Sequence, residues 1–441
     1  MQISMKEFLS RLSNRRNSKI RIFIATLLVY IFFYFFLFKS SSYAADHTPQ
    51  LWEIRSIDTM KFSRDLAREK ANDKSFDQEI EDEVGKIKEL GANYIAISTP
   101  YDDEFYPYLK RWVEFSRKSG LSIWFRGNWS GWEGWFNYPK TLARIEHIQK
   151  TRNFILQHPE LFVDGDSFTA CPECEYGGPG NPMDTHDYEG FRKFMIDEYR
   201  EMNQAFIAIG KKVRVNWLSL NPDVAKSILD EGTVKTLDNL ITLDYYVKEV
   251  TQLEKGLDNI KNKFSEARFL IGEFGAPIPD INGAMTDTEQ AQFIRNILNY
   301  LGSRKDVIGI NYWVLKGGST SLINPDGSSR TAVEVIKNYY MPGIVKGTVI
   351  NTINEQLKGI AVKTKDGLST VTDDQGKYNL AVPAGPLELT IEADRYKSAK
   401  RDIKVSRGSE NVLDIVLDPQ NMSLWYRIRS AFQNPRNLYH R

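Results

Sequence analysis

The chain has little of what a metal centre or a polyanion-binding protein requires. Its 441 residues include only two cysteines, and 58 basic side chains balance 57 acidic ones to give a net charge of +1. A balanced charge supplies no field for holding a nucleic acid, so we expect no nucleic acid partner. Cys171 and Cys174 form a C-x-x-C motif, which is half of a tetrahedral zinc site, and the nearest histidine, His186, has no second histidine at ligand spacing. We therefore expect no metal, and either an external disulfide or two packed thiols.

Charge is also missing from one long stretch near the N-terminus. Residues 22–38 carry no charged side chain, and at about 1.5 Å per residue they cover about 25 Å, the short end of a spanning helix. We predict a basic cytoplasmic segment at 1–21, a transmembrane signal anchor at 22–39 and a linker at 40–50, with the rest outside the cytoplasm. Ser42-Tyr43-Ala44 resembles a small-residue cleavage site, so secretion after cleavage is the alternative.

From residue 51 to residue 341, short apolar runs alternate with amphipathic stretches, which is typical of parallel strands covered by helices. Eight runs are expected as strands: 53–57, 94–98, 122–126, 167–171, 213–218, 240–243, 269–272 and 308–313. Eight strand-helix units over about 290 residues predict an α/β fold, a (β/α)8 TIM barrel. An open doubly wound sheet would also alternate, but it would rarely place acids and aromatics after so many strand ends.

Beyond Pro342-Gly343 the helical periodicity stops and short β-rich runs alternate with turns. We predict a small antiparallel, all-β sandwich at 342–418. Its Thr372-Asp373-Asp374-Gln375-Gly376-Lys377-Tyr378 segment, followed by Val382-Pro383-Ala384-Gly385, resembles the carboxypeptidase regulatory-like, transthyretin-like domain. The tail at 419–441 mixes aromatic and basic residues, which predicts a basic amphipathic helix or a frayed terminus.

Two strand ends in the barrel region carry glutamates. Glu175 follows the fourth expected strand, and Glu273 ends the seventh, about 98 residues later. A barrel unit takes about 31 residues, so this gap equals about three units. The carboxyl ends of barrel strands meet at one face, where one carboxyl group can protonate a glycosidic oxygen while another attacks the anomeric carbon. Glu173 lies on the same side of the extended segment as Glu175 and is the alternative acid/base.

These positions resemble the clan A glycoside hydrolases of the cellulase and β-galactosidase type, whose barrels place the acid/base at strand four and the nucleophile at strand seven. Glu173-Cys174-Glu175-Tyr176-Gly177 is similar to the Glu-Asn-Glu-Tyr-Gly signature of one β-galactosidase branch, with Cys174 where the clan has the asparagine that binds the sugar 2-hydroxyl. The resemblance implies that Glu175 is the acid/base and Glu273 the nucleophile of a retaining β-glycosidase that needs no cofactor.

Eight further residues at strand ends are predicted to bind substrate, because they are aromatic or offer polar groups to the mouth: Arg126, Asn128, Trp129, Trp132, Trp135, Tyr245, Tyr246 and Trp313. By the same resemblance, a tyrosine after the sixth strand would hydrogen-bond the nucleophile, and Trp313 would give the sugar a stacking floor. The three tryptophans after the third strand recur at every third position, which predicts a sugar subsite or, alternatively, a hydrophobic plug.

Together these observations predict a membrane-anchored, externally facing glycoside hydrolase that acts on a polysaccharide or oligosaccharide. One alternative is a binding protein that keeps the sugar-stacking aromatics on a barrel scaffold and has lost hydrolysis. The other is a structural surface protein in which the barrel only spaces the C-terminal domain from the membrane. The sequence names no protein partner.

Overall fold

The computed structural model describes residues 50–178, 180–421 and 428–429. The predicted anchor at 22–39 and its flanking segments lie outside these residues, as does most of the tail at 419–441. Within the described part of the chain, no helix has the length and apolar character needed to cross a bilayer.

The N-terminal part of the described chain forms a curled, parallel eight-stranded sheet of TIM-barrel type, with strand order β4-β3-β2-β1-β8-β7-β6-β5. The two ends of the sheet meet through a parallel bridge between Ser167 and Arg214. The strands are β1 (Ile54–Asp58), β2 (Tyr94–Ile97), β3 (Ser122–Phe125), β4 (Ser167–Phe168), β5 (Ser219–Leu220), β6 (Leu240–Asp244), β7 (Arg268–Phe274) and β8 (Val307–Tyr312). The prediction of a curled parallel sheet is thereby confirmed.

Two of the expected strands differ from those in the structure. β4 ends at Phe168, so Cys171 lies in the loop that follows. The fifth strand was expected at 213–218 but forms at Ser219–Leu220, because only those residues pair with β6, whereas Arg214 makes a single bridge to β4. Both differences shorten the sheet on the side where Glu173 and Glu175 are found.

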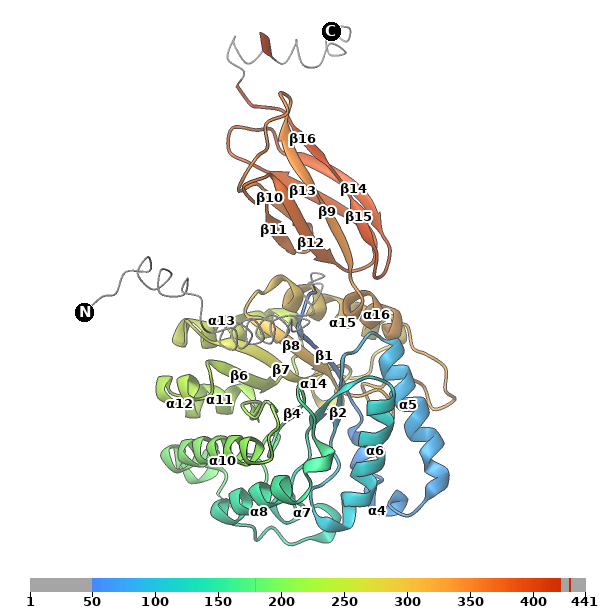
Figure 1. Ribbon diagram of the computed structural model, residues 1–441, viewed down its shortest axis with the longest axis vertical. Coiled ribbons are helices and arrows are strands. Elements are labelled where there is room, and N and C mark those ends of the chain that lie inside the picture. Colours follow the sequence, from blue (N-terminus) through green and yellow to red (C-terminus); the bar gives the residue numbers. More distant parts are fainter. Residues whose placement is uncertain (1–49, 179, 422–427, 430–441) are drawn as a thin grey trace, which may run out of the picture. The chain divides into compact units, whose positions relative to one another are not determined.

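Helices cover the outside of the sheet (Figure 1). The longer ones are α5 (Asp77–Glu89), α6 (Tyr106–Lys118), α8 (Arg144–Gln157), α10 (Tyr188–Ala208), α11 (Pro222–Ile228), α12 (Glu231–Thr236), α13 (Val250–Lys263), α15 (Asp287–Ser303) and α16 (Ala332–Tyr340). Short helices occur in the loops: α3 (Met60–Ser63), α4 (Ala67–Lys70), α7 (Ser130–Glu133), α9 (Pro182–Thr185) and α14 (Pro279–Asn282). Apolar residues at helical spacing, such as Ile80, Val84 and Ile87 of α5, are fully buried against the sheet.

The barrel interior is filled by side chains rather than open. One buried cluster consists of inward-facing residues from the strands and the segment before β5: Ile54, Tyr94, Ala96, Trp124, Trp217, Leu240 and Leu270. Large rings in this layer close the lower part of the barrel, so polar side chains one step further along the strands lie at the mouth formed by the carboxyl ends.

The C-terminal domain consists of two β-sheets with a shared apolar core. Its strands are β9 (Gly343–Asn351), β10 (Ala361–Thr364), β11 (Ser369–Val371), β12 (Lys377–Val382), β13 (Gly385–Glu392), β14 (Ala399–Val405), β15 (Glu410–Val412) and β16 (Ile415–Leu417). The expectation of a purely antiparallel arrangement is wrong, because β15 and β16 both pair with β9 in parallel.

Candidate active site

Glu273 reaches the barrel mouth because β7 carries a bulge. Leu243 of β6 pairs with Ile271, but the next residue, Asp244, pairs with Glu273, so β7 has one extra residue at this point. A bulge of this kind turns a side chain that strict alternation would send outward. The extra residue is Gly272, and a Cβ there would lie 2.2 Å from Asp244 Oδ1, so only glycine fits without displacing Asp244.

Arg126 follows β3 and occupies the centre of the mouth. It lies two residues after Trp124, so the two side chains share the inner face, and its guanidinium group sits 4.9 Å from the centroid of the Trp124 ring. Its Nη1 donates to the bulged carbonyl of Gly272 at 2.8 Å. The carbonyl of Gly272 also accepts from Asn311 Nδ2 on β8 at 2.9 Å. The bulge is thus held by side chains from two other strands.

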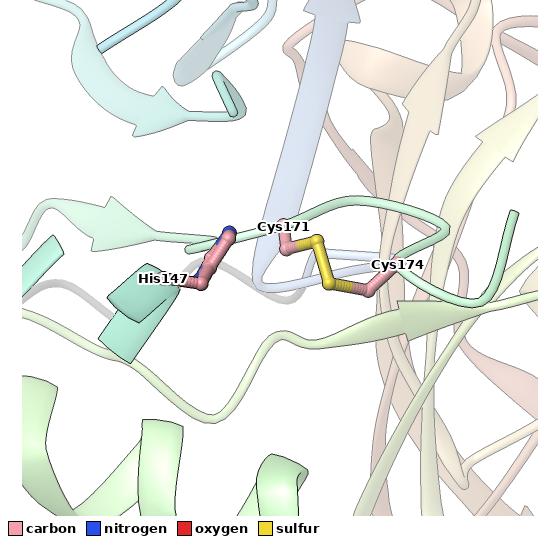
Figure 2. Close-up of side chains that lie close together, drawn as sticks. All are labelled: His147, Cys171 and Cys174. Atoms are coloured by element: carbon pink, nitrogen blue, oxygen red, sulfur yellow. A yellow bond between two sulfur atoms is a disulfide. The ribbon is translucent and has the colours of Figure 1, made fainter. Parts of the chain in front are cut away.

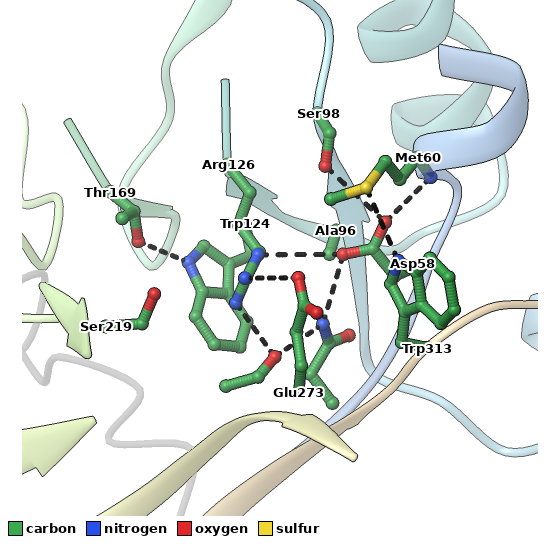
Figure 3. A network of polar contacts seen from close by, with 12 residues as sticks. Asp58, Met60, Ala96, Ser98, Trp124, Arg126, Thr169, Ser219, Glu273 and Trp313 are labelled. Carbon is green, nitrogen blue, oxygen red and sulfur yellow. Dashed lines mark hydrogen bonds and ion pairs between the residues drawn. The ribbon is translucent and has the colours of Figure 1, made fainter. Parts of the chain in front are cut away.

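Three carboxyl groups, those of Asp58, Asp244 and Glu273, surround the Arg126 guanidinium group, and Figure 3 shows Asp58 and Glu273 beside it. Arg126 Nη2 donates to Glu273 Oε1 at 2.7 Å and to Asp244 Oδ2 at 3.1 Å, and its Nε lies 3.6 Å from Asp58 Oδ2. Burial alone would lower the pKa of Arg126, but Asp244, Glu273 and Asp58 outweigh it, so the pKa is raised and the guanidinium group stays charged. Burial also raises the pKa of Asp58, although Arg126 opposes the shift. Asp58 therefore holds its proton to a higher pH than an exposed aspartate does.

Tyr246, just beyond β6, completes the environment of Glu273. Its hydroxyl group donates to Glu273 Oε2 at 2.7 Å, so each carboxylate oxygen of Glu273 has its own donor. Burial, followed by the charge of Asp244, raises the pKa of Glu273 to about 8, whereas Arg126 and the Tyr246 hydroxyl group act in the opposite direction. Above that pH, Glu273 is an oriented carboxylate with 6% of its surface exposed.

Trp313 lies beside this pair at the end of β8. Its ring meets Tyr246 edge-on, with centroids 6.2 Å apart, and its Nε1 faces Met60 Sδ at 3.4 Å. The ring is half-buried, so part of it remains open. A half-open indole beside a carboxylate is a suitable surface on which to stack a sugar ring.

A groove of about 940 Å³ adjoins Trp313, lined by residues of the loops after β1 and β8. A Cβ on Gly318, one of its lining residues, would lie 3.5 Å from the Trp313 ring, so the groove and the ring are neighbours. Phe62 and Phe76 stack in its wall, with centroids 6.2 Å apart. The volume is in the range of ordinary small-molecule sites.

Glu173 and Glu175 lie in the loop after β4, and both bond to Asn221 at the start of α11. Asn221 Nδ2 donates to Glu173 Oε1 at 2.5 Å, and the Asn221 backbone N–H donates to Glu175 Oε1 at 2.7 Å. Glu175 is fully buried, and its Oε2 has no hydrogen-bond partner among the described residues. Glu173 is only partly buried. Of the two carboxyl groups, Glu173 is the more accessible.

The two glutamates also differ in their electrostatic neighbours. Burial raises the pKa of Glu173 to about 9, and the charges of Asp244, Glu273 and Glu175 add to the increase. Burial raises the pKa of Glu175 to about 7, while hydrogen bonds from the backbone N–H groups of Asn221 and of Glu175 itself oppose the shift. Glu273 is thus one of the neighbours that raise the pKa of Glu173, after burial and Asp244. At neutral pH, Glu173 keeps its proton.

The other predicted binding residues are divided between the mouth and the packed interior. Trp129 and Trp132 are buried: Trp129 Nε1 donates to Thr151 Oγ1 at 2.8 Å, and Trp132 stacks on Phe194 with centroids 5.4 Å apart. For these two the structure favours the hydrophobic plug over a sugar subsite. Trp135 remains half-buried, with the Arg64 guanidinium group 4.8 Å from its ring.

Asn128 and Tyr245 also turn away from Glu273. Asn128 is buried and donates to Glu133 Oε1 at 2.5 Å, and the hydroxyl group of Tyr245 donates to the carbonyl of Gln252 on α13 at 3.2 Å. Only Arg126 and Tyr246, of the eight predicted binding residues, bond directly to the predicted nucleophile. Asn128 and Tyr245 instead bond to residues away from Glu273.

Cys171 and Cys174 form a disulfide, one of the two predicted states. Figure 2 shows His147 beside it, and a ring nitrogen of His147 lies within 4.8 Å of both sulfur atoms. His147 is held by Asn128 Oδ1 at 2.9 Å from Nε2 and by Glu198 Oε2 at 3.2 Å from Nδ1. The sulfur atoms are bonded to each other, so neither offers a thiolate to a metal ion.

The sequence-based prediction left several residues of the mouth without a role. Asp58, Asp244 and Asn311 belong to the polar cluster around Arg126, and Ser219 donates to Asp244 Oδ2 at 2.8 Å. Asp58 and Asp244 directly follow the first and sixth expected strands, so a search for acids at every strand end would have found them. No comparable signal marks Asn221, which acts through the position of α11.

Residues 344–418 match the carboxypeptidase regulatory-like domain, which confirms the prediction for the C-terminal region. No curated protein matches the chain. Solved structures similar to it include a trimodular endoglucanase of subfamily GH5_4 (10% identity, 81% of this chain and 78% of that one, TM-score 0.48). A fungal β-1,4-galactanase is similar at 13% identity (65% of this chain and 99% of that one, TM-score 0.46). β-Glucuronidase 3 of Bacteroides uniformis is similar at 14% identity (76% of this chain, TM-score 0.40), and the chain spans only 47% of its length.

Proposed function

We propose that the barrel is a retaining glycoside hydrolase that cleaves β-glycosidic bonds, with Glu273 as the nucleophile. The observation that carries this proposal is the double hydrogen bonding of Glu273 at the mouth. Arg126 and Tyr246 each donate to one carboxylate oxygen at 2.7 Å, which fixes the orientation of the group and favours its ionised form. A positioned carboxylate beside an aromatic ring and a protonated second carboxyl group is the equipment that a two-carboxylate hydrolysis needs.

We assign the acid/base role to Glu173, the alternative to Glu175 that the sequence offered. A leaving-group oxygen must reach the acid, and Glu173 is partly exposed whereas Glu175 is fully buried. The pKa of Glu173, raised to about 9, keeps its proton available at neutral pH, and the charge of Glu273 contributes to that shift. Glu175, bonded to the backbone of α11, then supports the loop instead of touching the substrate.

The reaction runs in two steps. Glu173 donates its proton to the glycosidic oxygen while a Glu273 oxygen attacks the anomeric carbon, which breaks the glycosidic bond and leaves a glycosyl ester on Glu273. Glu173, now a carboxylate, takes a proton from water as that water attacks the same carbon and releases Glu273. Trp313 stacks on the sugar at the cleavage point, and the neighbouring groove accepts further sugar units. The substrate is thus an oligosaccharide or polysaccharide.

The test is hydrolysis of a panel of β-linked glucans, galactans, mannans and xylans, measured as the rate at which reducing ends are released. Glu273→Gln should lower kcat/KM at least about 10³-fold, because the nucleophile is lost. Glu266→Gln is the matched control, since Glu266 is exposed and precedes the same strand. Normal turnover by the Glu273→Gln variant, or binding of glycans by the wild-type protein without any cleavage, would refute the proposal.

We propose further that the barrel lies outside the cytoplasm, attached to the membrane by residues 22–39. Two observations support this placement: the basic segment before the apolar run, and the Cys171–Cys174 disulfide, which suits an oxidising compartment. Protease added to intact cells should degrade the barrel and leave the N-terminal segment with the membrane. Protection of the barrel in intact cells would contradict this placement.

A further inference from the structure

The Cys171–Cys174 disulfide encloses the proposed acid. Its sequence separation is three residues, so Pro172 and Glu173 are the only residues inside the ring that it closes. Glu173 has φ of 45°, in the left-handed region that residues other than glycine rarely adopt. Something other than intrinsic preference must hold Glu173 in this conformation.

Sheet hydrogen bonds do not hold it, because β4 ends at Phe168. The ring is instead attached through side chains at both of its ends. Asn128 Nδ2 lies 3.1 Å from Cys171 Sγ, and Trp132 Nε1 donates to the carbonyl of Cys174 at 3.3 Å. Both sulfur-bearing residues are buried, with exposures of 1% and 6%. The ring is thus a small rigid unit fixed to the loop after β3.

Glu173 itself joins this unit to the catalytic cluster. Its backbone N–H donates to Ser219 Oγ at 3.3 Å, and Ser219 Oγ donates in turn to Asp244 Oδ2 at 2.8 Å. Asn221 Nδ2 bonds to its carboxyl group. These contacts are made from β5 and the loop that follows, so their geometry depends on where the ring presents Glu173.

We propose that Cys171 and Cys174 are positioning residues, whose disulfide holds the Glu173 carboxyl group in place for proton transfer. This inference rests on the proposed function. Without the cross-link, the loop would gain conformations in which Glu173 leaves the left-handed region and its carboxyl group moves away from the leaving-group oxygen. Glu273 would stay in place, because it is held by strand β7 and by Arg126 and Tyr246. The disulfide therefore positions the Glu173 carboxyl group and not that of Glu273.

The experiment compares wild-type protein with the double variant Cys171→Ser/Cys174→Ser on two kinds of substrate. One is a glycoside with a poor leaving group, such as an oligosaccharide or a methyl glycoside, which needs the acid. The other is the matching 2,4-dinitrophenyl glycoside in the presence of azide, which needs neither protonation of the leaving group nor a general base. We expect kcat/KM to fall about 10²-fold for the first and less than about 3-fold for the second.

Each other outcome is informative. Unchanged rates on both substrates, or equal loss on both, would overturn the positioning role, because the second pattern signals damage to the whole site. Absence of turnover by the wild-type protein on every substrate would overturn the proposed function as well. Should the double variant fail to fold, the wild-type protein can be treated with a dithiol reductant and its free thiols counted after alkylation. The ratio of the two rates should then fall in step with the reduced fraction.

Discussion

The ends of β7 and β4 each present a carboxyl group at the barrel mouth, but they position it in different ways. β7 runs as regular strand to Phe274, and Glu273 is presented by a single bulge within it, with donors from the ends of β3 and β6. β4 stops at Phe168, and the loop beyond it presents Glu173 through a disulfide ring and contacts to Ser219 and Asn221. One carboxyl group is placed by the sheet and the other by a cross-linked loop.

The difference matches what the two proposed roles would require. A nucleophile must stay ionised and aligned with one carbon atom, so it benefits from strand geometry and from fixed donors on both oxygens. An acid that later becomes a base must hold a proton and then recover it, so it benefits from burial and neighbouring negative charge, which raise its pKa. The predictions below separate these two kinds of support.

The largest effect is expected from the choice between the two loop glutamates. Glu173→Gln should lower kcat/KM on oligosaccharides about 10³-fold, since the proton donor is lost, whereas Glu175→Gln should lower it less than about 10-fold. The wild-type pH profile should peak between about 8 and about 9, because Glu273 takes up a proton below its pKa of about 8 and Glu173 loses one above its pKa of about 9. A larger loss in Glu175→Gln would return the acid role to Glu175.

Arg126→Ala tests the strand-built half of the site. It removes the guanidinium group that pairs with Asp58, Asp244 and Glu273, so the pKa of Glu273 should rise and kcat/KM at pH 7 should fall about 10²-fold. Leaving buried carboxyl groups without their partner should also lower the free energy of unfolding by about 3 kcal/mol, measured by urea denaturation. Arg126→Lys keeps the positive charge but loses the paired hydrogen bonds to the Gly272 carbonyl and to Glu273. Its kcat/KM and its free energy of unfolding should lie between those of the wild-type protein and of Arg126→Ala. An unaffected pH profile in Arg126→Ala would show that the cluster is structural only.

Tyr246→Phe removes one hydrogen bond and leaves the ring. Because this bond lowers the pKa of Glu273, its loss should move the acid limb of the kcat/KM profile to higher pH, with a decrease of about 10-fold at pH 7. Tyr245→Phe is the matched control, since its hydroxyl group bonds to Gln252 on α13. A shift of the acid limb in both variants, or in neither, would contradict the assigned role of Tyr246.

The contrast between β7 and β4 also explains which site residues could be predicted from the sequence. Glu273 ends an apolar run that predicts a buried strand, so local pattern and strand order were sufficient to place it at the barrel mouth. The hydrogen bond from a tyrosine after the sixth strand was expected from the family resemblance, which left Tyr245 and Tyr246 both open, and the structure makes it from Tyr246. For Glu173 and Glu175 the same reasoning gave two candidates, because a period of two places both on one side of an extended segment. The loop is not extended: the disulfide and the left-handed Glu173 depend on contacts with Asn128 and Trp132, which a local pattern does not encode.

Tryptophan spacing left two alternatives open for a related reason. A recurrence of three positions places rings on one side of a helical turn, but it does not say whether that side faces solvent or the protein. Trp132 is buried because Phe194 of α10 lies beneath it and Gly177 and Gly178 lie over it. Those partners are distant in sequence, so the choice between subsite and plug needed the fold.

Glu83 of α5 shows what burial alone does to a carboxyl group, and gives the smallest expected effect on activity. It is fully buried, and within the part of the chain that the structure describes neither carboxylate oxygen has a hydrogen-bond partner. Burial raises its pKa well above the ordinary value, with Lys316 opposing the shift. Since the folded state then binds a proton more tightly than the unfolded state, stability falls as the pH rises from about 4.5 toward the raised pKa, by about 1.4 kcal/mol per pH unit.

The glutamine in Glu83→Gln cannot ionise, so the free energy of unfolding of this variant should equal that of the wild-type protein near pH 4 and exceed it at pH 8. Its kcat/KM should stay within about 2-fold of the wild-type value. Glu173→Gln should show the same gain in stability at high pH, because its pKa is also raised by burial, but with nearly complete loss of turnover. Urea denaturation at several pH values measures both. If the Glu173→Gln variant gained no stability at high pH, the Glu173 carboxyl group of the wild-type protein would be solvated in the folded state. The loop after β4 would then not hold a protonated acid beside Glu273.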